Sequence, residues 1–173
     1  MENINEKIDN FVDEIFNYVE YKGVPTYYIK TREDAIEPTR GSAEAAGYDL
    51  YVPNTEDEIT IPAHSTVKID TGIAVALPDN TFGAIFARSG LATKQGLRPA
   101  NCTGVVDSDY RGSIGIALHN DTNEDKIIKG GDRIAQLVVI PYMSINLILT
   151  DNLDETGCGK KGFRKYRSVI WIK

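Results

Sequence analysis

The sequence predicts an all-β domain, built as a sandwich, a jelly roll or a barrel. From about Thr26 to Leu149, short β-prone runs alternate with Gly, Pro, Asn and Asp, and almost no helical periodicity lies between them. The length of 173 residues fits one domain of ordinary size. Hydrophobic residues make up 42% of the chain and charged residues 25%, which is typical of a globular protein rather than a disordered one.

An extra amphipathic helix is predicted ahead of this domain, over residues 1–24. Its apolar residues recur at the spacing of one helix face, and they are Ile4, Ile8, Phe11, Val12, Ile15, Phe16 and Val19. The other face is mostly acidic, and Gly23 and Pro25 end the helix. The apolar face must pack against something. The alternatives are the β domain, the same helix of another subunit, and a separate protein partner.

The β domain is predicted to span residues 25–156 as one compact unit, because many of its strand pairings would be non-local. Its predicted strands, in chain order, are Thr26–Lys30, Tyr48–Val52, Thr66–Asp70, Ile73–Leu77, Phe82–Ala87, Ile114–Leu118 and Ile134–Ile140. Residues 157–173 form a third region, a basic tail that contains lysines and arginines but no acid.

Composition excludes several classes of function. The net charge of −6 argues against direct binding to nucleic acid, which needs a basic face. No apolar run is long enough to cross a membrane, and acidic residues interrupt the region behind Met1 where a signal peptide would have its apolar core. Cys102 and Cys158 are too few for a disulfide framework or a zinc cluster. We therefore expect an intracellular, cytoplasmic protein, in the host cell if the source is a phage or virus.

Five polar segments carry candidate chemistry. In the first, Asp49 follows Gly47 at the start of a strand, where it is either a turn residue or a functional carboxylate. In the second, Arg88, Ser89 and Gly90 follow an apolar strand. A guanidinium, a hydroxyl and accessible backbone N–H groups suit a phosphate, although a surface turn explains the same residues.

The third segment, from Asn101 to Gly112, holds Asp107 and Asp109, which share a side if the backbone is extended. An amide and the Tyr110 ring flank them, a set that could read a base edge, stack a sugar and orient water. A β-turn with exposed acids is the alternative.

The fourth segment places Gln136 in an otherwise buried strand, where it must be hydrogen-bonded and either braces the core or meets a ligand. The fifth is a glycine-flanked basic loop, Gly159–Phe163. A solvated tail explains that loop equally well.

In this order, the five segments resemble the five motifs of the trimeric dUTPases, the dUTP nucleotidohydrolases. AAGYDLY, ARSGLATKQGL, NCTGVVDSDYRG and GDRIAQLVV match nearly residue for residue, and the resemblance runs from about Tyr27 to Phe163. It implies a jelly-roll-like β fold, a homotrimer with shared active sites, and hydrolysis of dUTP to dUMP and pyrophosphate with Mg²⁺. Such a reaction limits uracil in DNA and supplies dUMP for thymidylate synthesis.

The resemblance also implies roles for matching residues. Asp107 would be the general base that activates a water for in-line attack on the α-phosphorus. Tyr110 would stack under the deoxyribose and discriminate against UTP. The uracil edge would be read by Asn101 together with backbone groups between Gly104 and Val106.

The phosphate chain would be held by one group of residues, namely Arg88, Ser89, Gly90 and Gln136. Asp49 would contact waters on the Mg²⁺, which itself sits mainly on phosphate oxygens. Arg133 would brace the assembly rather than touch substrate, and Phe163 would cap the uracil. In a trimer, we expect the N-terminal helix to pack within the assembly.

Motif five departs from the family. The family reads Arg-Gly-x-x-Gly-Phe-Gly-Ser-Thr-Gly, whereas Cys158 stands here in place of the Arg and a basic run follows Phe163. Codons for Arg164–Ser168, shifted by one base, can encode Gly-Ser-Thr-Gly, so a frameshift is one explanation that the coding DNA would test. The resemblance implies that this C-terminal tail is a lid that orders the triphosphate for in-line attack. A defective lid would therefore reduce turnover. The alternatives are therefore a dUTP-binding regulatory protein with little turnover and, less favoured because DSDYRG is intact, a dCTP deaminase.

Overall fold

The computed structural model describes residues 23–54 and 57–156. They comprise a β unit that ends at Met143 and a second segment, residues 144–156, without a helix or strand. The predicted N-terminal helix, apart from positions 23 and 24, and the basic tail with Phe163 lie outside the described residues. Within the described ranges, no helix has both the length and the apolar character needed to cross a membrane.

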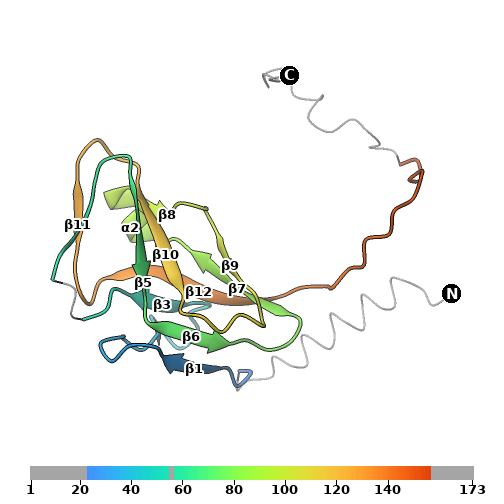
Figure 1. Cartoon of the computed structure of the whole chain (residues 1–173), viewed down its shortest axis with the longest axis horizontal. Helices are drawn as coiled ribbons and strands as arrows, with labels where there is room; N and C mark the ends of the chain where they lie inside the picture. The colour runs from blue at the N-terminus through green and yellow to red at the C-terminus, as the bar shows by residue number, and fades with distance from the viewer. Residues whose placement is uncertain (1–22, 55–56, 157–173) are drawn as a thin grey trace. The chain divides into compact units, whose positions relative to one another are not determined.

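The β unit consists of short strands and one short helix (Figure 1). The strands are β1 (Tyr27–Lys30), β2 (Thr39–Arg40), β3 (Tyr48–Tyr51), β4 (Ile59–Ile61), β5 (Thr66–Asp70), β6 (Ile73–Ala76), β7 (Thr81–Phe86), β8 (Leu97–Pro99), β9 (Gly104–Val106), β10 (Gly115–Asn120), β11 (Lys126–Ile128) and β12 (Arg133–Pro141). The helix is α2 (Ser89–Gln95). The all-β prediction is confirmed, and each predicted strand is present with ends displaced by at most two residues.

The five-stranded sheet has the order β2-β3-β12-β7-β9, and all its neighbouring strands are antiparallel. Its central strand, β12, is the longest of the described strands. The register between β12 and β3 shifts between Arg133 and Ala135, as at a β-bulge. This sheet carries most of the candidate site, because β3, β12 and β9 each belong to one of the sequence motifs and β7 leads directly into another.

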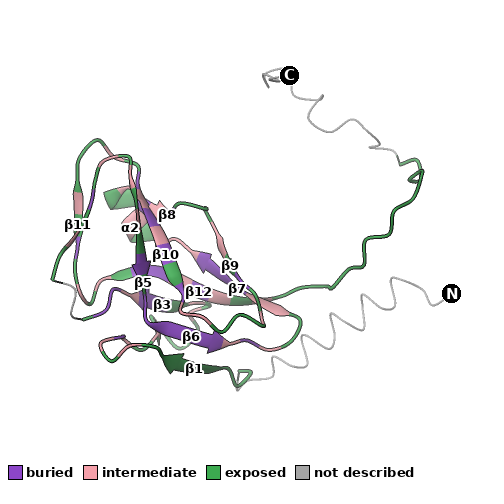
Figure 2. Ribbon diagram, viewed as in Figure 1, coloured by how far each residue is buried: buried purple, intermediate pink, exposed green. Residues whose placement is uncertain are grey.

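Three smaller sheets complete the unit. The order β5-β10-β8 forms a three-stranded sheet, and β1-β6 and β11-β4 form two-stranded pairs. Figure 2 shows how unequal the first pair is, since β6 is mostly buried while all four residues of β1 are exposed. An exposed edge strand of this kind offers unpaired backbone groups to another chain.

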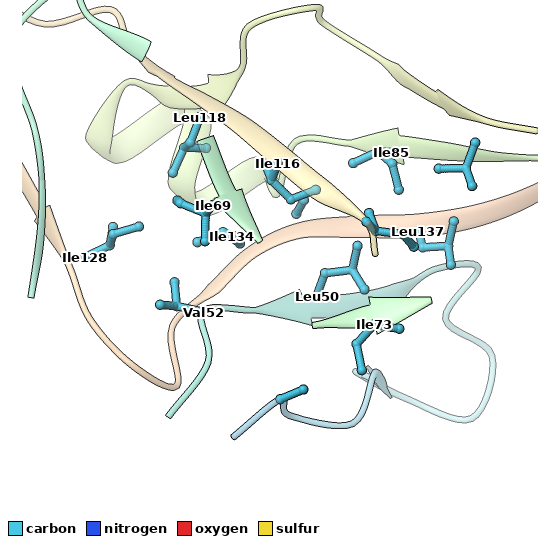
Figure 3. Packing of buried hydrophobic residues seen from close by; sticks show 14 of the residues in the cluster. Leu50, Val52, Ile69, Ile73, Ile85, Ile116, Leu118, Ile128, Ile134 and Leu137 are labelled. Atoms are coloured by element: carbon cyan, nitrogen blue, oxygen red, sulfur yellow. The ribbon is translucent and has the colours of Figure 1, made fainter. Parts of the chain in front are cut away.

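The core lies where the five-stranded and three-stranded sheets face each other (Figure 3). Leu50 of β3 and Ile134 of β12 pack in one cluster with Ile116 and Leu118 of β10. On β10 the buried positions alternate with less buried ones, as the period of two in a strand requires. The result is a sandwich whose inner faces are aliphatic. Side chains outside this core remain accessible to a ligand.

The helix α2 is not among the predicted elements, because the residues after the apolar strand suit either a phosphate-binding segment or a surface turn. Gly96 ends the helix in the left-handed conformation, with φ of 67° and with its N–H bonded to Ala92 O. A seven-residue helix without any buried residue has no apolar period to detect in the sequence. Five strands are also missing from the prediction, because two or three residues are too few to show an alternating pattern. They are β2, β4, β8, β9 and β11.

The segment of residues 144–156 exposes several large apolar side chains. Its large apolar side chains have exposed fractions of 70% to 98% in the single chain, and they are Ile145, Leu147, Ile148, Leu149 and Leu153. In the isolated chain these side chains do not contribute to the buried core.

Candidate active site

The pairing of β12 with both of its neighbours aligns three sequence motifs. Gln136 lies opposite Asp49 of β3 on one side and opposite Phe86 of β7 on the other. Arg88 follows β7 by two residues and is the N-cap residue of α2. Residues far apart in the sequence therefore meet at one end of the five-stranded sheet.

Asp49 accepts hydrogen bonds from two arginines. Arg88 Nε donates to Oδ1 at 2.9 Å, and Arg133 Nη1 donates to Oδ2 at 3.1 Å. Asp49 is 8% exposed, and a buried carboxylate needs such partners to offset its lost hydration. Within one chain, Asp49 therefore holds the guanidiniums of both Arg88 and Arg133 in place.

Gln136 stabilises the junction between β7 and α2. Its Nε2 donates a hydrogen bond of 3.0 Å to Ala87 O, one residue before Arg88. A Cβ at Gly47 would come within 3.1 Å of Gln136 Oε1, so the glycine leaves room for the amide. The amide therefore braces the structure at this point, and it also lines a pocket; contact with a ligand stays a prediction.

A cationic pocket of about 450 Å³ opens beside these groups. Its lining brings together the predicted Asp49, Arg88, Ser89, Gly90 and Gln136. The remaining lining residues are Gly41, Ala45, Gly47, Leu91, Lys94, Gln95 and Arg133. Arg133, expected to brace the assembly, therefore faces the pocket as well, and Lys94 was missed although it follows Gly90 by one helical turn.

A second pocket, of about 260 Å³, contains Asp107, and we call it the Asp107 pocket. Strand β9 and its flanking loops contribute the predicted Asn101, Gly104, Val106, Asp107 and Tyr110. The other lining residues are Lys68, Ile85, Pro99, Val105, Ser113, Ile114, Gly115, Ile116 and Ala117. The candidate base and the candidate nucleoside-binding residues thus share one pocket.

Asp107 and Asp109 do not share a side of an extended strand. The N–H of Tyr110 bonds to Asp107 O at 3.1 Å, which closes a turn directly after β9. Asp107 lines the pocket, whereas Asp109 does not. Of the two alternatives for this pair, the backbone therefore adopts the β-turn with exposed acids, although Asp107 also lines a pocket. Across the described residues, no protein group pairs with the Asp107 carboxylate, which is exposed and available to a water.

The Tyr110 side chain lies over Gly112. Its hydroxyl donates a hydrogen bond of 3.2 Å to Ser113 O, and a Cβ on Gly112 would lie 2.6 Å from the ring carbon Cζ. Only a residue without a side chain leaves the ring this position. The turn therefore holds a flat aromatic surface at the Asp107 pocket.

Asp70 lies beside the Asp107 pocket, bonded to Ser113. The Ser113 hydroxyl donates to Asp70 Oδ1, and Gly72 N donates to the same oxygen at 3.0 Å. Partial burial acts to raise the pKa of Asp70, but these bonds and the charges of Arg32 and Lys68 together hold that pKa below its ordinary value.

The cationic pocket and the Asp107 pocket have no lining residue in common. Within one chain, Asp107 and Arg88 therefore do not face the same cavity. The predicted site residues fall into two separate groups, which local sequence spacing could not reveal.

Comparisons with known proteins agree with these motifs. The dUTPase family model matches residues 33–166. A deoxyuridine 5'-triphosphate nucleotidohydrolase of Desulfitobacterium hafniense is 46% identical over 137 residues, which cover 79% of this chain and 90% of that protein. The chain belongs to the dUTPase family. A probable deoxyuridine 5'-triphosphate nucleotidohydrolase of Schizosaccharomyces pombe is 42% identical across 78% of this dUTPase and 92% of its own length.

Solved structures give the same assignment for the fold. A Staphylococcus bacteriophage 80alpha dUTPase mutant with dUpNHpp has a TM-score of 0.71 and 25% identity, covering 80% of this dUTPase and 96% of that chain. A dUTPase mutant from phage phi11 of S. aureus, described with a structural Mg(II) ion, has a TM-score of 0.66 and 24% identity, covering 75% and 98%. As a member of this family, the chain hydrolyses dUTP to dUMP and pyrophosphate.

Proposed function

We propose that each active site forms between subunits of a homotrimer, with the Asp107 pocket of one subunit completed by the cationic pocket of its neighbour. The observation that carries this proposal is the separation of the two pockets, which have no lining residue in common. A single dUTP molecule needs a base at its α-phosphorus and cations at its phosphate chain. One chain supplies these groups in different cavities, and a second copy brings them together.

The apolar residues beyond the β unit also support an assembly. Ile145, Leu147 and Leu149 are at least 70% exposed in the isolated chain, and covering them would contribute favourable burial free energy. The shared site proposed above already requires a second copy of the chain, and that copy could cover these side chains. This segment would then pack on a neighbouring subunit.

Asp107 acts as the general base in this proposal. Its exposed carboxylate has no partner among the described residues, so it is available to hold and deprotonate the attacking water. Arg88, held by Asp49, would then orient the phosphate chain of the substrate for in-line attack. Ser89, Gly90 and Gln136 would contribute hydrogen bonds to the same chain.

The nucleoside part of dUTP would lie in the Asp107 pocket. The Tyr110 ring offers the surface on which a deoxyribose would stack. The side chain of Asn101 and the backbone from Gly104 to Val106 would read the uracil edge, because an amide both donates and accepts hydrogen bonds. Phe163, outside the described residues, would cap the base.

Mg²⁺ would arrive on the triphosphate. The described residues contain no group of three or more His, Cys, Asp or Glu that could hold a metal by itself. Asp49 has both carboxylate oxygens bonded to arginines, and its remaining lone pairs can reach the ion through water. When bound, the ion would neutralise phosphate charge and fix the geometry of the triphosphate.

The divergent motif five would lower the turnover of this enzyme. Cys158 replaces a cation of the family pattern, and the glycine-rich sequence after Phe163 is absent. A dUTP-binding regulator with little turnover is the alternative. Tight binding of dUpNHpp by a chain that releases almost no pyrophosphate from dUTP would favour that regulator.

Subunit mixing tests the shared site. Arg88→Ala and Asp107→Asn are each expected to lose pyrophosphate release by about 10²-fold or more. When equal amounts of the two variants are unfolded and refolded together, random assembly gives about one quarter of the sites both intact residues, so about a quarter of the wild-type rate should return. Refolding each variant alone is the control. A mixture as inactive as its components would mean that each site lies within one chain.

A further inference from the structure

The cationic pocket contains one positive side chain that the proposed mechanism does not use. Arg88 and Arg133 each donate to Asp49. Lys94 lines the same pocket, and its ammonium has no hydrogen bond or ion pair with any residue in the part of the chain that the structure describes. An exposed lysine is usually paired or solvated, but this one faces a cavity shared with two guanidiniums.

Lys94 is placed by the helix α2. It follows Gly90 by four residues, so the two lie one above the other on the same helix face. Long side chains on a helix lean toward its N-terminus, which directs the Lys94 stem toward Gly90. Nothing lies within 4 Å of the position that a Cβ on Gly90 would take, so there is open space over the glycine.

The charge of the pocket supports a polyanionic ligand. Arg88, Arg133 and Lys94 oppose one carboxylate, Asp49, which leaves a formal charge of about +2. A magnesium-bound nucleoside triphosphate carries a formal charge of about −2 near neutral pH. Without Lys94, half of the excess positive charge in the pocket would be lost.

We propose that Lys94 is a further substrate-binding residue, which contacts the phosphates that leave as pyrophosphate. This inference rests on the shared site proposed above. In that site the nucleoside and the attacked phosphorus lie in the Asp107 pocket, so the part of dUTP that reaches the cationic pocket is the remainder of the phosphate chain. Lys94 acts there as a point charge, whereas Arg88 acts as an oriented donor.

Calorimetric titration with dUpNHpp and with dUMP, both with Mg²⁺, tests this assignment on the full chain. Lys94→Ala should weaken binding of dUpNHpp by about tenfold and leave dUMP binding within about twofold of the wild type. Lys94→Arg should keep most of the affinity, because it keeps the charge. Lys129→Ala is the matched control, since Lys129 is also exposed and lines neither pocket.

The outcomes separate the two proposals. If Lys94→Ala loses no more affinity for dUpNHpp than Lys129→Ala does, Lys94 is not a ligand of the substrate. Equal losses for dUMP and dUpNHpp would also overturn the assignment, because the contact would then not lie on the leaving phosphates. A wild-type chain that binds dUpNHpp no more tightly than dUMP would instead contradict the proposed phosphate site. Should Lys94→Ala fold poorly in a thermal melt, Lys94→Gln carries the same expectations.

Discussion

Arg88 and Asp49 stand 39 positions apart in the sequence, yet Nε of the arginine donates a hydrogen bond of 2.9 Å to Oδ1 of the aspartate. This bond connects the segment after β7 to β3, across the central strand β12, and restricts where the remaining N–H groups of the guanidinium point. The N–H donors of a guanidinium lie in one plane, so they can bind a phosphate in a defined direction only when that plane is held in place.

Asp49→Asn should therefore weaken the enzyme more than it weakens the fold. We expect kcat/KM for dUTP to fall by about 10- to 100-fold, because both guanidiniums lose their charged acceptor. Unfolding in urea should show a loss of about 1–2 kcal/mol, since the arginines are partly exposed. Asp121→Asn is the control, because it breaks another Asp–Arg pair, with Arg98, outside both pockets. Similar kinetic losses in both variants would contradict a specific function of the Asp49 contact.

Gly112→Ala should displace the Tyr110 ring, since the added Cβ would lie 2.6 Å from its Cζ. We expect KM for dUTP to rise by about tenfold or more, as the stacking surface under the sugar moves. Tyr110→Phe, which loses a single exposed hydrogen bond, should change KM by less than about threefold. If Gly112→Ala has wild-type kinetics, the ring position is not important for binding.

Asn120→Ala should be one of the more destabilising single changes in this chain. Its buried amide donates to Ile61 O and Glu124 O at 2.9 and 2.8 Å, and its oxygen accepts from Thr122 N at 2.9 Å. Because all these partners lose their bonds together, we expect the free energy of unfolding to fall by about 3–4 kcal/mol. Asn123→Ala, at an exposed position, should cost less than about 1 kcal/mol in the same urea titration. Comparable losses in the two variants would refute a special function of the buried amide.

Ser113→Ala should raise the pKa of Asp70 by removing one of the hydrogen bonds that lower it. A carboxyl with a lowered folded-state pKa stabilises the protein above its unfolded-state pKa of about 3.9, and this stabilisation is lost as pH falls through the folded-state value. The variant should therefore unfold at a slightly higher pH in an acid titration. NMR titration of Asp70 measures the shift directly, with Ser65→Ala as the control; an unchanged Asp70 titration would mean that the Ser113 bond is weak.

The longer strands and the motif residues could be predicted from the sequence, because both depend on local pattern. Gln136 shows how far that reasoning reaches: a polar residue in an apolar strand must be bonded, and its amide does donate to Ala87 O. Asp107 and Asp109 show where it stops. Their spacing of two allows either a common side or a β-turn, and only the structure shows that a backbone bond between Tyr110 and Asp107 turns the chain.

The division of the site could not be predicted from residue spacing. Asp107 and Arg88 belong to consecutive motifs, yet they line different cavities, because β9 and the end of β7 lead to different parts of the surface. Lys94 was missed because its relation to Gly90 depends on a helix too short to leave an apolar period. Such relations follow from tertiary structure and from the number of copies that assemble.

The contact of Gln136 with the carbonyl before Arg88 has a consequence for how substrate is captured. Because this bond and those of Asp49 join residues of the chain itself, the fold orders the arginine end of the site, and little conformational entropy remains to be lost on encounter with a ligand. Substitutions that release Arg88 from these bonds would therefore slow capture of the triphosphate, because the guanidinium would then have to be ordered during binding.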